Sequence, residues 1–356
     1  MRTLTQTGLA ALALMMCLTA TAQDAAYPEP QRHNYVIENF EFESGDVLPE
    51  MNVSYLTIGD PANPPVLITH GTTGQATSML GDKFAGNLFG PDQPLDAGKY
   101  FLILVDAIGA GQSSKPSDGL RAKFPEQTLL DMVNAQKMLL EDGLGIDRLH
   151  LKIGFSMGGM LTWTWLTEYP DFMDGGVPIA SFPGPMSGRN WMMRRMVIDA
   201  VRDDPAWNNG NYEEQPPMLR YMSTWFGLAT SGGNLRLQKL GATNEMASAY
   251  VDERKANQKV GDANDTMYMW NASRNFDPTP KLSDIKAPVL LIISQDDERN
   301  PVELPMLEEG MKKVPNGQVY IVPEDDETTG HGTTYNASYY AAPLAEFLKG
   351  LPNAPM

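Results

Sequence analysis

The stretch HLKIGFSMGGM (residues 150–160) contains the most informative residue of the chain, Ser156. Residues 150–153 read as a short buried strand, residues 154–158 as a G-x-S-x-G turn, and the chain from Gly159 onward as a helix. A serine on such a turn exposes its hydroxyl beside the positive end of the helix dipole. The flanking glycines avoid collisions with the neighbouring strand and helix. Because the motif arises by chance in about one chain in ten of this length, its surroundings must support it.

Short apolar runs alternate with helical patterns along most of the chain. Residues 129–140 present one apolar helical face that ends at Gly143 and Gly145. Tyr35–Phe42 and Met51–Ile58 alternate as two antiparallel strands. The remaining runs are typical of strands buried on both faces of a parallel sheet; they are residues 65–69, 100–105, 149–153, 176–180, 288–293 and 318–322. Strands that alternate with helices predict an α/β fold with a mostly parallel central sheet and flanking helices.

The alternation stops after residue 181 and resumes near residue 277. Residues 182–276 are rich in Met, Trp and Arg and predict a helical cap inserted after the sixth strand. The expected organisation is therefore a signal peptide (1–22), a first core segment (23–181), the cap (182–276) and a second core segment (277–356). Such a cap would cover the carboxyl edge of the sheet, where ligands bind in open α/β folds. Its larger apolar side chains fit an acyl pocket or, more readily, the packing of the cap core or of a dimer: Trp191, Met192, Met193, Met196, Met218, Met222 and Trp225.

The N-terminus has the pattern of a cleavable secretory signal. Arg2 supplies a positive charge, Leu9–Leu18 is apolar but too short to span a bilayer, and Ala20–Ala22 offers a cleavage site. A disordered cytoplasmic N-terminus is the alternative. Cleavage would remove the single cysteine, Cys17, and would change the formal net charge from −17 to −18, since Arg2 is the only charged residue removed. We expect a periplasmic or secreted protein without a membrane-inserted segment, whose acidity disfavours nucleic-acid partners.

A nucleophilic serine needs a base, and the base needs an orienting acid. His331, one of four histidines, follows the last predicted strand, where the chain order of nucleophile, acid and histidine requires the base. Asp296, Asp297 and Glu298 follow the strand at 288–293 and compete for the role of the acid. Because these acids lack a regular ligand spacing, the sequence predicts no metal site and no cofactor.

The oxyanion formed during attack needs two hydrogen-bond donors. The backbone N–H of Met157, at the start of the helix after Ser156, is the first candidate. The loop after the strand at residues 65–69 supplies the second, which we assign to the backbone N–H of Thr72. Both roles rest on main-chain groups, so side-chain substitutions would test them poorly.

Several segments together resemble the α/β-hydrolase superfamily and, within it, the homoserine O-acetyltransferase-like family. They are residues 70–74 (HGTTG), 154–160 (GFSMGGM), 169–171 (YPD), 200–205 (AVRDDP), 210–212 (GNY), 262–265 (DAND) and 330–331 (GH). The resemblance implies a Ser156–His331–Asp297 triad that works through an acyl-enzyme, and a helical cap that often mediates homodimers. Hydrolases of this type place the acid four residues before a proline, here Pro301, which favours Asp297 and leaves Asp296 as the alternative.

Two departures from the family bear on the second half of the reaction. Homoserine acetyltransferases have an aspartate directly after the histidine and an arginine in the cap helix, where this chain has Gly332 and Ile198; Arg194 and Arg195 lie one turn earlier. An amino acid with both charges unpaired would bind poorly, and a secreted protein lacks acetyl-CoA. We therefore expect hydrolysis of a small carboxylic ester, with acyl transfer as the alternative. A serine peptidase or amidase and a non-catalytic binding module stay open.

Overall fold

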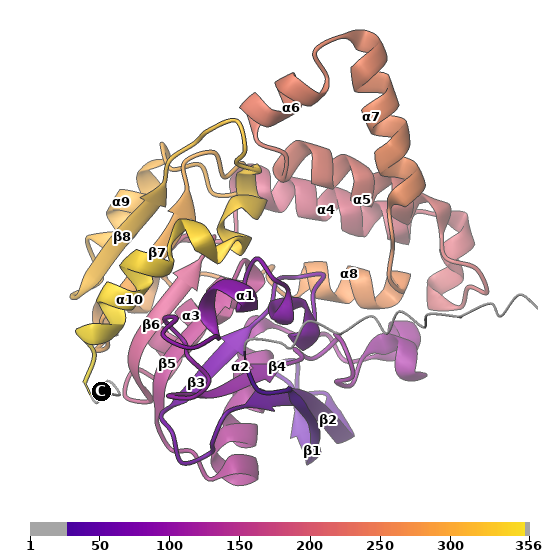
Figure 1. Cartoon of the computed structure of the whole chain (residues 1–356). Coiled ribbons are helices and arrows are strands. Elements are labelled where there is room, and N and C mark those ends of the chain that lie inside the picture. The colour runs from indigo at the N-terminus through magenta and orange to yellow at the C-terminus, as the bar shows by residue number, and fades with distance from the viewer. Residues whose placement is uncertain (1–26, 353–356) are drawn as a thin grey trace, which may run out of the picture.

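The computed structural model describes residues 27–352, so the predicted signal peptide lies outside the described residues. A single eight-stranded sheet has the order β1-β2-β4-β3-β5-β6-β7-β8. All strands from β3 to β8 run parallel, whereas β2 pairs antiparallel with β1 and with β4. The predicted α/β fold with a mostly parallel sheet is confirmed (Figure 1). The strands are β1 (Gln31–Glu41), β2 (Val47–Ile58), β3 (Pro65–Thr69), β4 (Phe101–Val105), β5 (Leu149–Phe155), β6 (Met173–Ile179), β7 (Val289–Ser294) and β8 (Gly317–Val322).

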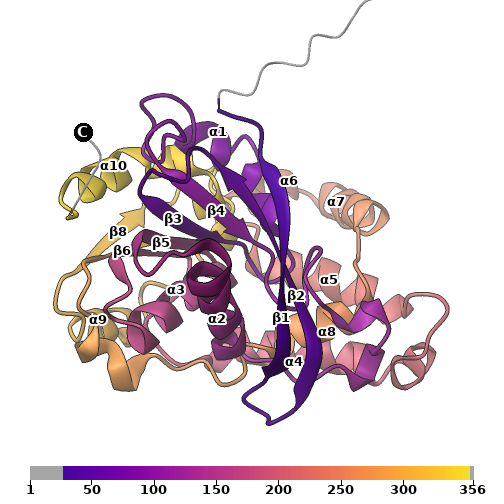
Figure 2. The ribbon, with the colours of Figure 1, turned by 90° about the horizontal axis from the view of Figure 1, so that it is seen from below.

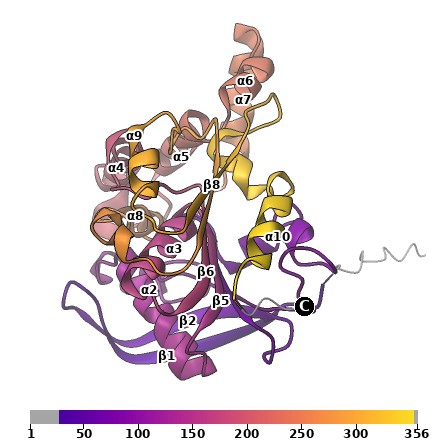
Figure 3. The ribbon, with the colours of Figure 1, turned by 90° about the vertical axis from the view of Figure 1, so that its left-hand side faces the viewer.

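Helices cover both faces of this sheet (Figures 2 and 3). In β4, Phe101, Ile103 and Val105 contribute to one apolar core, and Leu102 and Leu104 contribute to the other. This alternation with a period of two is what a strand buried on both faces requires. The first core includes α2 (Leu129–Met138), α3 (Met157–Glu168) and part of α9 (Pro305–Met311); the second includes α1 (Ala85–Leu88) and α10 (Ala341–Lys349).

The first two strands form a long hairpin at one edge of the sheet (Figure 2). Its turn contains Gly45 at φ +84°, a left-handed conformation that glycine adopts without steric cost. The antiparallel pair predicted from the sequence is therefore present. Both strands begin earlier than the alternating pattern indicated, at Gln31 rather than Tyr35 and at Val47 rather than Met51.

A layer of helices lies between β6 and β7 in sequence and over the carboxyl edge of the sheet in space (Figure 1). α4, α5 and α8 pack around their own apolar core, which includes Val197, Leu219 and Trp270. α6 and α7 project away from the sheet. The cap helices are α4 (Gly188–Arg202), α5 (Pro217–Thr230), α6 (Asn234–Leu240), α7 (Asn244–Asn257) and α8 (Ala263–Asn271).

The apolar side chains that the sequence suggested for an acyl pocket lie elsewhere. Trp191, Met193 and Met222 pack within the cap core. The others are exposed on the outer surface of the cap, because α4 and α5 turn only one face toward the core: Met192, Met196, Met218 and Trp225. The acyl-pocket hypothesis is therefore wrong for this set, and the core-packing interpretation holds for part of it.

Candidate active site

Ser156 lies in the turn between β5 and α3, with φ 58° and ψ −111°. This backbone conformation is sparsely populated for residues other than glycine and is maintained only when the surrounding structure imposes it. The N–H of Ser156 donates to the Ile179 carbonyl at 2.8 Å, and the Ser156 carbonyl accepts from the Met160 N–H at 3.0 Å. The turn is thus held between the neighbouring strand and the helix that follows it.

The glycines around Ser156 allow three backbone segments to meet at this turn. A Cβ on Gly154 would lie 2.3 Å from the Gly158 carbonyl oxygen, and a Cβ on Gly158 would lie 2.1 Å from the Thr69 carbonyl oxygen. A Cβ on Gly159 would lie 2.6 Å from the Ile179 carbonyl oxygen. The collisions expected from the motif therefore exist, and they involve β3 and β6 as well as α3.

We expect Gly158→Ala to lower the free energy of unfolding by about 3 kcal/mol, because the added methyl group meets backbone rather than a movable side chain. Urea denaturation followed by circular dichroism measures the change. Gly86→Ala is the matched control, since its Cβ finds nothing closer than 3.6 Å, and should change stability by less than about 0.5 kcal/mol. Equal stabilities of the two variants would contradict the steric argument.

Three side chains from distant parts of the sequence meet at the carboxyl edge of the sheet. His331 Nε2 lies 2.8 Å from Ser156 Oγ. On its other side, His331 Nδ1 lies 2.9 and 3.0 Å from the two carboxylate oxygens of Asp297. All three are buried. They follow β5, β7 and β8, whose carboxyl ends lie along one edge of the sheet, and their arrangement is that of a nucleophile, a base and an orienting acid.

The three acids that compete in the sequence hold three different parts of the histidine segment. Asp297 contacts the imidazole of His331, while Asp296 accepts a hydrogen bond from the Gly330 N–H at 2.9 Å. Glu298 accepts from the His331 N–H at 3.0 Å and also from the N–H groups of the cap residues Gly232 and Gly233. Asp297 therefore contacts the imidazole of His331, whereas Asp296 and Glu298 hold the backbone of the segment that carries this imidazole.

Asp297 is itself held in place by backbone and side-chain donors. Its Oδ1 accepts from the N–H groups of Arg299 and Asn300 at 2.9 and 3.0 Å, and its Oδ2 accepts from Asn300 Nδ2 at 3.2 Å. Burial by itself would raise the pKa of the Asp297 carboxyl, but His331 and these donors hold it below its usual value. The carboxylate is therefore ionised at neutral pH and oriented toward the imidazole.

The two proposed oxyanion donors belong to Met157, the residue after Ser156, and to Thr72, which lines the same cavity as Ser156. Within residues 27–352, neither the Thr72 N–H nor the Met157 N–H donates to a protein acceptor. Met157 is the first residue of α3, so its N–H has no partner within the helix. The loop of Thr72 is held by His70, whose Nδ1–H donates to the Gly71 carbonyl at 2.8 Å while Nε2 accepts from the Ala107 N–H at 3.1 Å. Two free backbone donors beside a nucleophile are what an oxyanion hole requires.

A buried lysine that the sequence reasoning missed connects the two halves of this site. Lys152 Nζ donates to Thr69 Oγ1 at 2.6 Å, and Thr69 Oγ1 donates to the Gly158 carbonyl at 3.2 Å. Burial lowers the pKa of the Lys152 ammonium well below its usual value. The chain of contacts joins the end of β3 to the first turn of α3. A charged residue inside the apolar run of β5 was the available sequence signal.

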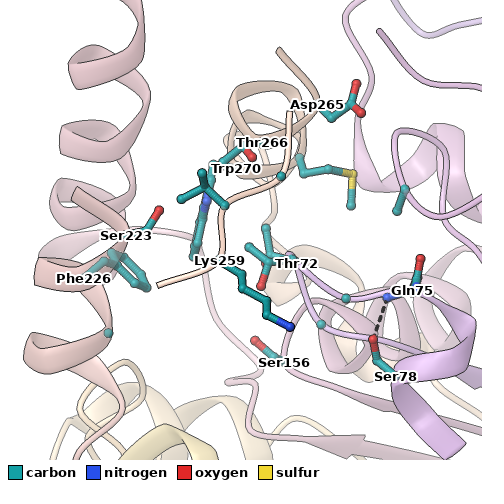
Figure 4. Close-up of a pocket in the computed structure, with 18 of the residues that line it drawn as sticks. Thr72, Gln75, Ser78, Ser156, Ser223, Phe226, Lys259, Asp265, Thr266 and Trp270 are labelled. Carbon is teal, nitrogen blue, oxygen red and sulfur yellow. Dashed lines mark hydrogen bonds between the residues drawn. The ribbon is translucent and has the colours of Figure 1, made fainter. Parts of the chain in front are cut away.

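A cavity of about 900 Å³ lies between Ser156 and the cap. Its apolar wall is formed by Phe155, Val197, Phe226, Met269 and Trp270. Figure 4 shows Trp270 and Phe226 above Ser156, on the side of the cap. These residues come from both core and cap, which explains why inspection of the cap sequence alone did not find them.

The two family positions that differ in sequence also differ in surroundings. Gly332 lines the cavity without a side chain, and Ile198 is buried in the cap core. Arg194, one turn before Ile198, is fully buried, with Nη1 3.2 Å from Ser273 Oγ and 3.5 Å from Thr72 Oγ1. Arg195 instead pairs with Asp199 at the surface. The cap helix therefore brings an arginine close to the oxyanion loop from a different position.

The base is expected to stay neutral down to an unusually low pH. Burial, followed by the positive charge of Arg299, lowers the pKa of His331 to about 4. A general base must be unprotonated, so kcat/KM should be flat from neutral pH down to about 5. It should then fall as the pH drops through the His331 pKa of about 4. A pH–rate profile measures this fall in kcat/KM, and recovery of activity after return to pH 7 shows that the protein has not been irreversibly denatured. A limb near the ordinary histidine value of about 6.5 would contradict this expectation.

The described residues also bear on membranes and metals. Between residues 27 and 352, no helix is both long enough and apolar enough to cross a bilayer. The same part of the chain holds no group of three or more His, Cys, Asp or Glu side chains placed to bind a metal ion.

The fold and the site define a class of protein that the comparisons with known proteins identify. Residues 64–326 match the family described as alpha/beta hydrolase fold. A homoserine O-acetyltransferase of Haemophilus influenzae is 32% identical over 299 residues, which cover 73% of this chain and 82% of that protein. The chain therefore belongs to the α/β-hydrolase superfamily and, within it, to the homoserine O-acetyltransferase-like family.

Other similar proteins are named as an acyltransferase and as an esterase. A Methanothermobacter thermautotrophicus protein named "Probable acyltransferase" is 26% identical over 324 residues, covering 89% of this chain and 97% of that protein. The crystal structure of esterase E22 has a TM-score of 0.78 and 20% identity, covering 90% of this chain and 100% of that chain. At 20% identity, the likeness to esterase E22 shows a shared fold.

Proposed function

We propose that this protein hydrolyses carboxylic esters through a Ser156 acyl-enzyme. The observation that carries the proposal is the continuous contact from Ser156 Oγ through the His331 imidazole to Asp297, beside two backbone N–H groups with no acceptor in the described residues. The acylation half of this chemistry is shared by esterases and acyltransferases.

In the proposed first step, Ser156 Oγ attacks the ester carbonyl carbon while His331 Nε2 takes its proton. Asp297 keeps the other ring nitrogen protonated and stabilises the imidazolium that forms. The N–H groups of Thr72 and Met157 bind the developing oxyanion. Collapse of the tetrahedral intermediate breaks the bond to the alcohol oxygen, which takes the proton from His331 Nε2 and leaves the acyl group on Ser156.

In the proposed second step, His331 Nε2 removes a proton from water, which attacks the acyl carbon. Collapse of this second tetrahedral intermediate breaks the bond between the acyl carbon and Ser156 Oγ, and Oγ takes the proton back from His331 Nε2 as the acid leaves. Two features support water as the acceptor. Gly332 offers no carboxylate to a substrate amine, and the residue aligned with the family's cap arginine, Ile198, is buried among apolar side chains. An amino-acid acceptor would therefore find no charged side chain at either of these two positions.

The choice between water and another acceptor can be measured directly. Purified protein is incubated with p-nitrophenyl acetate, with and without homoserine at about 10 mM, and the products are identified by mass spectrometry. We expect acetate as the product in both reactions, with no O-acetylhomoserine. Formation of O-acetylhomoserine in preference to acetate would establish the acyltransferase alternative. Absence of either product with a range of esters would contradict both.

We also propose that the protein acts outside the cytoplasm. The proposal rests on Arg2, the apolar Leu9–Leu18 and the cleavage pattern at Ala20–Ala22. N-terminal sequencing of the protein from its native cell envelope should begin at Gln23, and an intact Met1 would contradict export.

The outer surface of the cap is the face on which we propose that two copies associate. Met192 is 68% exposed there, and Met196 and Tyr221 are also exposed. Sedimentation should give a dimer that Met192→Glu dissociates; a monomeric unmodified protein at micromolar concentration would contradict the proposal.

A further inference from the structure

Positive side chains gather around the candidate active site of this acidic protein. Arg254, Lys259 and Arg299 line the cavity that contains Ser156, and Arg194 lies behind its wall. The chain as a whole carries a formal net charge of −17. The local sign is therefore opposite to that of the molecule, and a cavity of this kind concentrates anions beside the nucleophile.

None of these four cations has a carboxylate within ion-pair distance in the described part of the chain, whereas most of the surface lysines do. The guanidinium of Arg299 donates to Thr230 and Ser231 and lies 4.6 Å from the ring centre of Phe226. Among the nitrogens of these four side chains, Arg194 Nη2 and Arg254 Nε are buried and have no hydrogen-bond partner within residues 27–352. Unsatisfied donors of this kind favour an acceptor supplied from outside the chain.

The acidic side chains that line the same cavity are already engaged. Asp265 accepts from the N–H and the hydroxyl of Ser117 at 2.8 and 2.6 Å. Asp262 caps the first turn of α8 by accepting from the N–H groups of Asn264 and Asp265. Figure 4 shows Asp265 at the end of the cavity away from Ser156. Lys115, the remaining cation of the lining, is paired with Asp118 at 2.7 Å.

Lys259 is the cation best placed to meet a substrate. It lies on the segment 258–262, which joins α7 to α8, and its side chain extends from this segment into the cavity toward Ser156 (Figure 4). Lys259 is exposed, so its ammonium group is open to a substrate that enters the cavity from solvent, and salt should screen its attraction for an anion.

We infer that the physiological substrate is an ester that carries a carboxylate, and that Lys259 with Arg299 forms the subsite for that group. The inference rests on the proposed ester hydrolysis and adds the charge of the substrate to it. It uses residues other than the two family positions occupied here by Gly332 and Ile198. The carboxylate would reach these cations while the ester carbonyl lies between Ser156 and the oxyanion donors.

Matched pairs of esters test the inference. Mono-4-nitrophenyl glutarate is compared with 4-nitrophenyl pentanoate for a carboxylate on the acyl side, and 4-acetoxybenzoate with methyl 4-acetoxybenzoate for one on the alcohol side. Each kcat/KM is divided by the rate of hydroxide hydrolysis of the same ester. In at least one pair we expect the anionic member to be favoured about tenfold or more, and added salt to reduce the preference.

Variants of two lysines then assign the preference to a residue. Lys259→Met should bring the ratio toward one, and Lys259→Glu should reverse it, because the substrate then faces a like charge. Lys255→Glu is the matched control: this half-buried lysine on α7 pairs with Asp252 outside the cavity, and its replacement should leave the ratio unchanged. Equal effects of the two charge reversals would show a general field of the protein and would overturn the Lys259 subsite.

A binding experiment separates the failure of this inference from the failure of the proposed function. Ser156→Ala is titrated calorimetrically with glutarate and with its neutral analogue glutaramide. Tighter binding of glutarate, lost in the double variant with Lys259→Glu, supports the subsite even if no ester is turned over. Serine-dependent hydrolysis without preference for any anionic ester, together with equal binding of the two ligands, would overturn the inference and leave the esterase proposal standing.

Discussion

Replacement of Ser156 by alanine should lower kcat for p-nitrophenyl acetate by about 10⁴- to 10⁶-fold. The reason is that Ser156 Oγ is the atom that becomes acylated, and its contact with His331 Nε2 at 2.8 Å is the first link of the triad. The oxyanion donors belong to the backbone and persist in the variant, so a small residual rate above that of water is expected. Single-turnover and steady-state assays of the purified protein measure the loss.

A control serine shows whether the loss reflects chemistry or folding. Ser248 lies on α7 of the cap and is exposed, so Ser248→Ala should leave the rate within twofold of the unmodified protein. Thermal unfolding of Ser156→Ala should show a folded protein. Unchanged turnover in Ser156→Ala would remove the enzyme mechanism proposed here, whatever the behaviour of the control.

Replacement of Asp297 by asparagine should lower kcat about 10⁴-fold, the second largest effect. The asparagine keeps an oxygen that can accept from the N–H groups of Arg299 and Asn300, which limits the disturbance of the loop. The amide nitrogen that then faces His331 Nδ1, however, donates a hydrogen bond where the carboxylate oxygen accepts one from Nδ1–H, and it has no charge to stabilise the imidazolium. The imidazole then favours the wrong tautomer, and Nε2 no longer removes the proton of Ser156.

The neighbouring acid provides the matched comparison. Asp296→Asn keeps the acceptor for the Gly330 N–H and has no contact with the imidazole of His331, so we expect a loss of less than about tenfold. The pH–rate profile adds a second readout, because Asp297, unlike Asp296, raises the pKa of His331 through its charge and its hydrogen bond. A larger loss in Asp296→Asn than in Asp297→Asn would exchange the two roles.

The sequence predicted the sheet and the strand-to-helix turn at Ser156 well, for a local reason. Each buried strand is a short run of apolar residues, and the turn at Ser156 depends on glycines within four residues of it. Patterns of this length are set by backbone sterics and by burial of neighbouring side chains. The hairpin β1–β2, the parallel strands and the helical layer before β7 all followed from such patterns.

The contents of the cavity did not follow from local patterns. The Met and Trp residues of the cap face its own core or the outer surface, while the cavity is lined by Phe226, Met269 and Trp270. Which face of an amphipathic helix meets the sheet depends on how several helices pack together. Periodicity defines an apolar face but does not say which of two neighbours that face will contact.

For this protein, the sequence by itself determined the class of fold, the strand-to-helix turn at Ser156 and the order of serine, acid and histidine along the chain. The tertiary structure decided which acid contacts His331, how Asp296 and Glu298 fix its backbone, and which cations line the cavity that contains Ser156. The physical reason is distance along the chain. Contacts between residues 156, 297 and 331 form only when parallel strands align their carboxyl ends, and that alignment is a property of the whole sheet.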